Sequence, residues 1–187
     1  MIDNINIYHI TWVTYASWIN EKVFKYAKHS NLSQKPIELT LQDEIEITKY
    51  IAEIVKQDAL KIIAYNICCD HIHLIIVCEE KKIKSIIQKL KAVSSRKYNI
   101  AHNKTRPLSN KDKYKIKKGV RGKTQNHLWA KGFSFAIVES DKKLENVLQY
   151  VNNNRIKHNL PRSNELNRVI DKILTPMEDV YNWLDSL

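Results

Sequence analysis

The sequence predicts an α+β fold: a ferredoxin-like βαββαβ core with an antiparallel sheet, followed by C-terminal helices that carry Tyr150. Two observations predict it. Short runs rich in β-branched residues alternate with stretches whose apolar residues recur three and four positions apart, in the order strand, helix, strand, strand, helix, strand. Further helical patterns then follow the last of these strands.

Each core element has its own signal. Residues 5–15 alternate between polar and apolar side chains, as a strand would, and residues 39–57 show a helical pattern with Thr40 as the N-cap. Residues 60–68 are expected to form the second strand, 69–70 a turn, and 71–80 the third strand. The second helix is predicted from apolar residues at helical spacing: Ile83, Ile86, Ile87, Leu90 and Val93. Residues 132–140 complete the core as its last strand.

The C-terminal helices are marked by capping residues. Ser140 opens a helix that ends near Pro161, and Ser163 caps the next one. A capping box at Thr175, with proline at the first helical position, predicts a short final helix. We expect residues 1–187 to form one domain, with a core at 5–139 that contains a basic insertion at about 102–126. The tyrosine helix is expected at about 141–158 and a helical tail at 163–187.

The composition limits the class of protein. The chain has 187 residues and is 43% hydrophobic, which suits one domain with a buried core. It has neither an apolar run of about 18 residues nor a signal-peptide pattern, so we expect a cytoplasmic protein. The three cysteines lack CxxC spacing and are expected to be reduced thiols. With 31 Lys and Arg against 20 Asp and Glu, the net charge of +11 favours a polyanionic partner.

Much of the charge lies in the basic insertion. Between residues 102 and 123 stand nine basic residues against Asp112 alone: Lys104, Arg106, Lys111, Lys113, Lys115, Lys117, Lys118, Arg121 and Lys123. One interpretation is a solvated loop without a further role. The other is a DNA-binding arm, because each Lys or Arg that neutralises a phosphate releases roughly one counterion.

Two histidines, His71 and His73, stand two apart at the head of the third strand, so both should project from one face. Three interpretations are open. They are packed core histidines, or part of a zinc site with Cys69 in the pattern C-x-H-x-H, or half of a site for Mg²⁺ or Mn²⁺. The third interpretation needs an oxygen donor and a nucleophile. Tyr150 and Asn154 are candidates, since residues four apart on a helix differ by about 40° in azimuth.

Three motifs, "DHIHLII", "LWAKGFSFAIVES" and "VLQYVNNNRIKH", together resemble the single-tyrosine HUH transposases of small insertion sequences and of the REP-associated group. The resemblance covers most of residues 5–158. It implies that His71, His73 and Asn154 bind Mg²⁺ or Mn²⁺ and that Tyr150 is the nucleophile. Asparagine at this ligand position is typical of the REP-associated group, whereas the insertion-sequence members have glutamine.

The resemblance also implies a function. A DNA transposase of this kind cleaves and rejoins single-stranded DNA through a 5′-phosphotyrosine intermediate during transposition of a small mobile element. Its expected partners are hairpin-containing single-stranded DNA and a second copy of the chain in a homodimer. Trp12, Trp129 and Phe133 are candidates for base stacking or for core packing. The alternative function is a non-catalytic RRM-like module that binds single-stranded RNA or DNA, because "KGFSFAIVE" overlaps the RNA-recognition signature.

Overall fold

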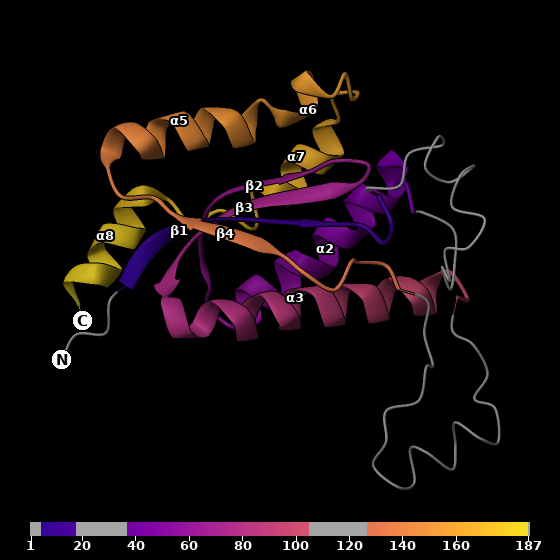
Figure 1. Cartoon of the computed structure of the whole chain (residues 1–187), viewed down its shortest axis with the longest axis horizontal. Helices are drawn as coiled ribbons and strands as arrows, with labels where there is room; N and C mark the ends of the chain where they lie inside the picture. The colour runs from indigo at the N-terminus through magenta and orange to yellow at the C-terminus, as the bar shows by residue number, and fades with distance from the viewer. Residues whose placement is uncertain (1–4, 18–36, 105–126, 187) are drawn as a thin grey trace, which may run out of the picture.

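A four-stranded antiparallel sheet forms the centre of the fold (Figure 1). The structure is a computed structural model that describes residues 5–17, 37–104 and 127–186. The strands are β1 (Ile5–Val13), β2 (Lys61–Ile67), β3 (His71–Glu79) and β4 (Ser134–Ile137), in the spatial order β2-β3-β1-β4. With the helices between them, this order is the ferredoxin-like arrangement, so the predicted fold class is confirmed.

Helices cover both faces of the sheet (Figure 1). Helices α2 (Leu41–Gln57) and α3 (Glu80–Ala101) lie on one face and enclose the main hydrophobic core, whereas α5 (Asp141–Asn152) lies on the other. A smaller cluster of Ala64, Ile75 and Val151 packs beneath α5. Because β3 is covered on both sides, its sequence is a continuous apolar run rather than an alternating one.

Capping residues explain where three of the helices in the described residues begin. Thr40 forms a capping box with Asp43 at the start of α2, and Ser140 and Ser163 cap α5 and α7 (Asn164–Ile170). The capping box predicted at Thr175 is wrong. The N-cap of α8 (Met177–Asp185) is Pro176, without a side-chain cap, because Thr175 instead hydrogen-bonds Ile62 at the outer edge of β2. This contact protects an otherwise open strand edge.

Two predicted elements are shorter than expected. The last strand covers only Ser134–Ile137 of the expected 132–140. The tyrosine helix, expected at about 141–158, breaks at Asn153 into α5 and the single turn α6 (Asn154–Lys157). Of the three aromatic residues considered for base stacking, Trp12 and Trp129 are core residues: both are buried and their rings meet edge to face with centroids 6.1 Å apart.

Two expectations about the chain as a whole can be compared with the structure. Cys68, Cys69 and Cys78 are free, as predicted. No helix in residues 5–17, 37–104 and 127–186 is long and apolar enough to cross a membrane.

Candidate active site

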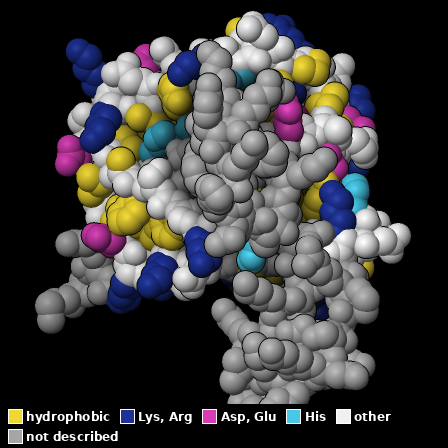
Figure 2. Space-filling model, turned by 45° about the vertical axis from the view of Figure 1, so that its right-hand side comes forward, with side chains coloured by type: hydrophobic (Ala, Val, Ile, Leu, Met, Phe, Trp, Pro, Cys, Tyr) yellow, Lys and Arg dark blue, Asp and Glu magenta, His cyan; other side chains and the backbone are white. Residues whose placement is uncertain are grey.

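The two histidines of β3 lie side by side on the face of the sheet that α5 covers. His73 pairs with Thr11 of β1 and His71 with Val13, so these four side chains lie on the same face of the sheet. The two rings meet edge to face with centroids 4.9 Å apart. The predicted adjacency on a central strand is confirmed. Histidine side chains are visible together in a recess in the upper part of the face drawn in Figure 2.

Asp70 orients the ring of His71. Its Oδ1 lies 2.5 Å from His71 Nδ1, so the ring nitrogen donates and the carboxylate accepts. This hydrogen bond lowers the pKa of the Asp70 carboxyl. A proton held on Nδ1 leaves the lone pair of Nε2 directed away from Asp70, which is the arrangement in which histidine binds metals.

His73 is held by two side chains of β1. Its Nδ1 lies 2.9 Å from Thr11 Oγ1 and 3.0 Å from His9 Nε2, and the His9 ring stacks on it with centroids 5.1 Å apart. Burial, followed by repulsion from His71 and other basic groups nearby, lowers the pKa of His73 to about 3. The His73 ring is therefore neutral at physiological pH and keeps a lone pair for a ligand.

Asn154 approaches the pair from α6. Its side chain is buried, with 1% of its surface exposed, and Nδ2 lies 2.6 Å from His71 Nε2. Its Oδ1 is buried and has no hydrogen-bond partner among the described residues. A half-turn of the amide exchanges the two atoms, so the oxygen can face the imidazole instead. A buried amide oxygen without a hydrogen-bond partner, on a side chain that contacts His71, suits a divalent cation.

The break between α5 and α6 is fixed by contacts to the core. The guanidinium of Arg155 donates to Glu44 of α2 (2.6 Å) and to the carbonyl of Ile67 in β2 (2.9 Å). Asn66 of β2 donates to the carbonyl of Val151, at 2.7 Å. The ion pair of Arg155 with Glu44 is buried on both sides, so removal of either partner would leave a charge without compensation. These interactions hold Asn154 in place although it lies outside α5.

Tyr150 completes the cluster. The residue is 41% exposed, and its ring stands edge-on to His73, with centroids 5.1 Å apart, and to His9 at 6.1 Å. The ammonium of Lys157 lies 5.1 Å from the centre of the Tyr150 ring. Thus the structure brings Tyr150, Asn154 and the two histidines together within one chain, although a helix break separates the first two.

Several side chains at this site were missed by sequence reasoning: His9, Thr11, Asp70, Lys157 and His158, whose ring centroid lies 5.0 Å from that of His71. One signal was available. His9 and Thr11 repeat on β1 the two-residue spacing of His71 and His73. If the two strands are neighbours, this polar pair lies beside the histidine pair on the same face of the sheet.

The zinc interpretation is not favoured. Cys69 lies in the turn before β3, and its thiol donates to Asp70 Oδ1 at 3.9 Å. Among the residues that the structure describes, no group of three or more His, Cys, Asp and Glu side chains is arranged to hold a metal ion. The donor set at this site is instead two imidazoles and an amide.

The basic insertion is described only at its start. Lys104 donates to the Tyr98 hydroxyl at 3.1 Å and lies over the Tyr98 ring at 4.5 Å, beyond the end of α3 and away from the histidines. The other eight basic residues lie outside the described residues: Arg106, Lys111, Lys113, Lys115, Lys117, Lys118, Arg121 and Lys123.

Comparisons with known proteins place the chain among transposases. A family model described as "Transposase IS200 like" matches residues 6–154. Comparison with curated protein sequences gave no match. One similar solved structure is a REP-associated tyrosine transposase bound to a REP hairpin, at 14% identity and a TM-score of 0.47, over 84% of this chain and 72% of that one. Another is a protein assigned as a transposase from Deinococcus radiodurans R1, at 16% identity and a TM-score of 0.41, over 80% of this chain and 91% of that one.

Proposed function

The chain belongs to the IS200-like transposase family, and from this premise we propose that it cleaves and rejoins single-stranded DNA with Tyr150 as the nucleophile. The proposal places the reaction in the transposition of a small mobile element. The observation that carries it is the position of Tyr150 against His73, together with the buried Asn154 amide, which contacts His71 and has an oxygen without a hydrogen-bond partner.

We propose His71, His73 and Asn154 as the ligands of Mg²⁺ or Mn²⁺. Two imidazole nitrogens and one amide oxygen leave coordination positions open for a phosphate. When bound, the cation would withdraw charge from the scissile phosphate. Asp70 and Thr11 support this role because each contacts the Nδ1 of one histidine and so leaves Nε2 for the ligand.

In the proposed step, the phenol oxygen of Tyr150 attacks phosphorus and forms the Tyr–O–P bond while the bond from phosphorus to the 3′ oxygen breaks. The phenol proton passes to water, and the departing 3′ oxygen takes up a proton and leaves as a hydroxyl. The positive charge of Lys157 beside the ring favours the developing phenolate. Because the link keeps the energy of the ester, a 3′ hydroxyl can reverse the step and join strands.

The proposed partner is single-stranded DNA that contains a hairpin. The net charge of +11 supports a polyanionic partner, and the family supports DNA. The basic insertion is proposed to add affinity by neutralising phosphates. The homodimer expected from the sequence stays a prediction, and the contact between Tyr150 and His73 of the same chain does not require a partner's helix.

The RRM-like alternative is less well supported. In that module the "KGFSFAIVE" signature belongs to the third strand, which is central in a ferredoxin-like sheet. Here the segment falls on β4, an edge strand that pairs only with β1 among the described strands. The alternative predicts reversible binding without any covalent adduct.

The test is a denaturing gel with Mn²⁺ and labelled single-stranded oligonucleotides that cover the DNA flanking the gene. Wild type should form a covalent protein–DNA adduct, and Tyr150→Phe should bind the same DNA without forming one. Tyr181→Phe is the matched control, since Tyr181 is also exposed but lies on α8. A Tyr150→Phe protein that still cleaves would refute the assignment.

A further inference from the structure

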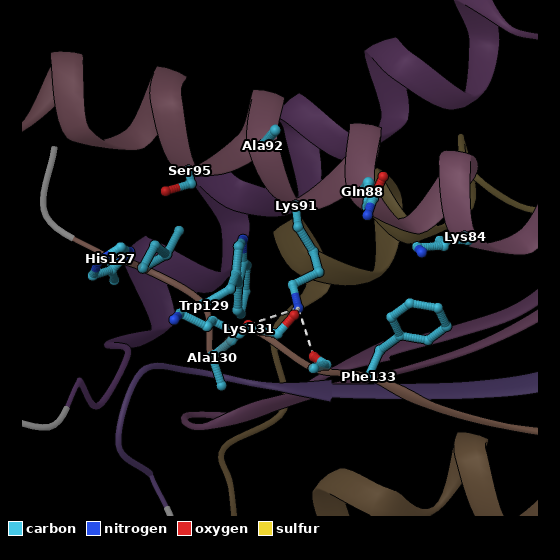
Figure 3. A pocket seen from close by; sticks show the side chains of 12 residues that line it. Lys84, Gln88, Lys91, Ala92, Ser95, His127, Trp129, Ala130, Lys131 and Phe133 are labelled. Atoms are coloured by element: carbon cyan, nitrogen blue, oxygen red, sulfur yellow. Dashed lines mark hydrogen bonds between the residues drawn. The ribbon is translucent and has the colours of Figure 1, made fainter. Parts of the chain in front are cut away.

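A second feature of the fold faces away from the histidines. An open groove of about 590 Å³ lies between α3 and the segment of residues 127–133 that leads into β4. None of its lining residues is acidic, and three are lysines: Lys84, Lys91 and Lys131. Figure 3 shows Lys91 reaching from α3 to the opposite wall, with Phe133 and Lys84 on one side of it and His127 on the other.

The three lysines differ in how they are held. The ammonium of Lys91 donates to the carbonyls of Ala130 (2.7 Å) and Gly132 (2.6 Å), so it fixes the wall of the groove. Lys84 and Lys131 are exposed, and their ammonium groups form no ion pair with any described residue. Two unpaired positive charges in a groove without carboxylates attract an anion.

Aromatic side chains lie beside these charges. Phe133 lines the groove, and Phe135 follows it on the same side of the chain, with ring centroids 6.1 Å apart and planes tilted by 35°. Phe135 is 48% exposed, although its ring edge contacts Tyr8 of the core. A half-buried Phe133 in the same groove as the lysines, followed by an exposed Phe135, forms an arrangement on which unpaired bases can stack while phosphates meet the charges.

The groove continues toward the face of the sheet that carries His71 and His73. A second hollow of about 250 Å³ shares Ala130, Gly132 and Phe133 with it and is also lined by Thr11 and Ser134. The hydroxyl of Thr11 lies 2.9 Å from His73 Nδ1. A continuous surface therefore leads from the lysines, around the edge of the sheet at β4, to the histidine pair.

We propose that this groove binds an unpaired stretch of the same DNA strand that Tyr150 cleaves. The bases would stack on Phe133 and Phe135, and the phosphates would lie against Lys84 and Lys131. This inference rests on the proposed function. It adds the place where the unpaired nucleotides beside the cleavage position bind. A base inside a duplex has no free face to stack on an aromatic ring, so duplex DNA should not occupy this groove.

The experiment measures binding in the Tyr150→Phe protein, so that DNA is not cleaved during titration. Fluorescence anisotropy compares a labelled single strand with the corresponding duplex. Phe135→Ala should weaken single-strand binding about tenfold, as expected when one base no longer stacks, and leave duplex binding unchanged. A thermal melt checks that the exposed position tolerates the change.

The charges are tested by a matched pair of double variants. Lys84→Gln with Lys131→Gln should reduce the salt slope of single-strand binding by about 1.4, at about 0.7 for each neutralised phosphate. Lys56→Gln with Lys172→Gln removes the same charge from the surface between α2 and α7, which shares no lining residue with the groove, and should leave the slope unchanged.

A third variant fills the groove without removing a charge. A Cβ at Gly132 would meet nothing within 4 Å, so Gly132→Leu should fold normally and weaken single-strand binding. Unchanged single-strand affinity in Phe135→Ala and Gly132→Leu would overturn the inference, as would equal weakening for duplex and single strand. If wild type still forms its adduct, the proposed function survives that result; if wild type neither binds nor cleaves single strands, both fail.

Discussion

The ring of Tyr150 stands edge-on to the ring of His73 in the same chain, with centroids 5.1 Å apart and planes at 80°. The two residues come from α5 and β3, and α5 packs on β2 and β3 of its own sheet. The proposed nucleophile and the proposed ligands are thus assembled within one chain. An exchange of the tyrosine helix between subunits is not needed to complete the site.

This arrangement predicts the result of a mixing experiment. Tyr150→Phe lacks the nucleophile and His73→Ala lacks a ligand, so neither should form an adduct with single-stranded DNA alone. If each chain builds its own site, a mixture of the two proteins should be as inactive as either one. Recovery of adduct on a denaturing gel, at up to about a quarter to a half of the wild-type amount, would show that the tyrosine acts on a partner's histidines.

The fold was predictable because its signals are local. The cap at Thr40 and the apolar run of β3 each depend on a few neighbouring residues. The two-residue spacing of His71 and His73 predicts that both lie on one face, and this prediction requires no information about the other strands.

The remainder of the site depends on long-range pairing. The register of β1 against β3 puts Thr11 opposite His73, and no local pattern sets that register. The break at Asn153 contains neither glycine nor proline, so the sequence predicts a helix that continues through it. Arg155 fixes the break through Glu44, 111 positions away in the chain. Such an interaction leaves no periodic trace in the sequence.

Asn154 is expected to control the metal requirement. Asn154→Ala removes the oxygen donor but keeps Tyr150, so the adduct should form slowly and need about ten- to a hundredfold more Mn²⁺ for half-maximal rate. Removal of the hydrogen bond to His71 should cost about 1–2 kcal/mol of unfolding free energy. Adduct formation is measured over a series of Mn²⁺ concentrations.

Two further variants separate ligation from packing. Asn154→Asp keeps an oxygen donor of nearly the same shape and should restore adduct formation at low Mn²⁺. Asn152→Ala changes an exposed neighbour on α5 and should leave the Mn²⁺ dependence as in wild type. If Asn154→Ala and wild type need the same Mn²⁺ concentration, Asn154 is a packing residue and not a ligand.

The basic insertion is expected to raise affinity without setting sequence preference. Replacing Lys111, Lys113, Lys115, Lys117 and Lys118 with glutamine should flatten the salt dependence of single-strand binding by up to about 3.5, at about 0.7 for each phosphate that is no longer neutralised. The ratio of affinities for two different oligonucleotides should change little, because binding to phosphates carries no sequence information. An unchanged slope would mean that these lysines are exposed to solvent and neutralise no phosphate.

The low pKa of His73 predicts how stability depends on pH in the metal-free protein. Burial lowers this pKa from 6.5 to about 3, so between these values the unfolded chain binds a proton that the folded chain does not. Stability should therefore fall as the pH falls below 6.5, by about 1.4 kcal/mol per pH unit, or about 2 kcal/mol between pH 7.5 and pH 5.

Urea unfolding with a chelator present measures this pH dependence, and His73→Gln, which cannot titrate, should lose the share that His73 contributes. Tyr150→Phe alters the same site without removing an imidazole and should keep it. Equal pH dependence in wild type and His73→Gln would show that the folded protein tolerates a charged His73, and its proposed place as a neutral ligand would then have to be abandoned.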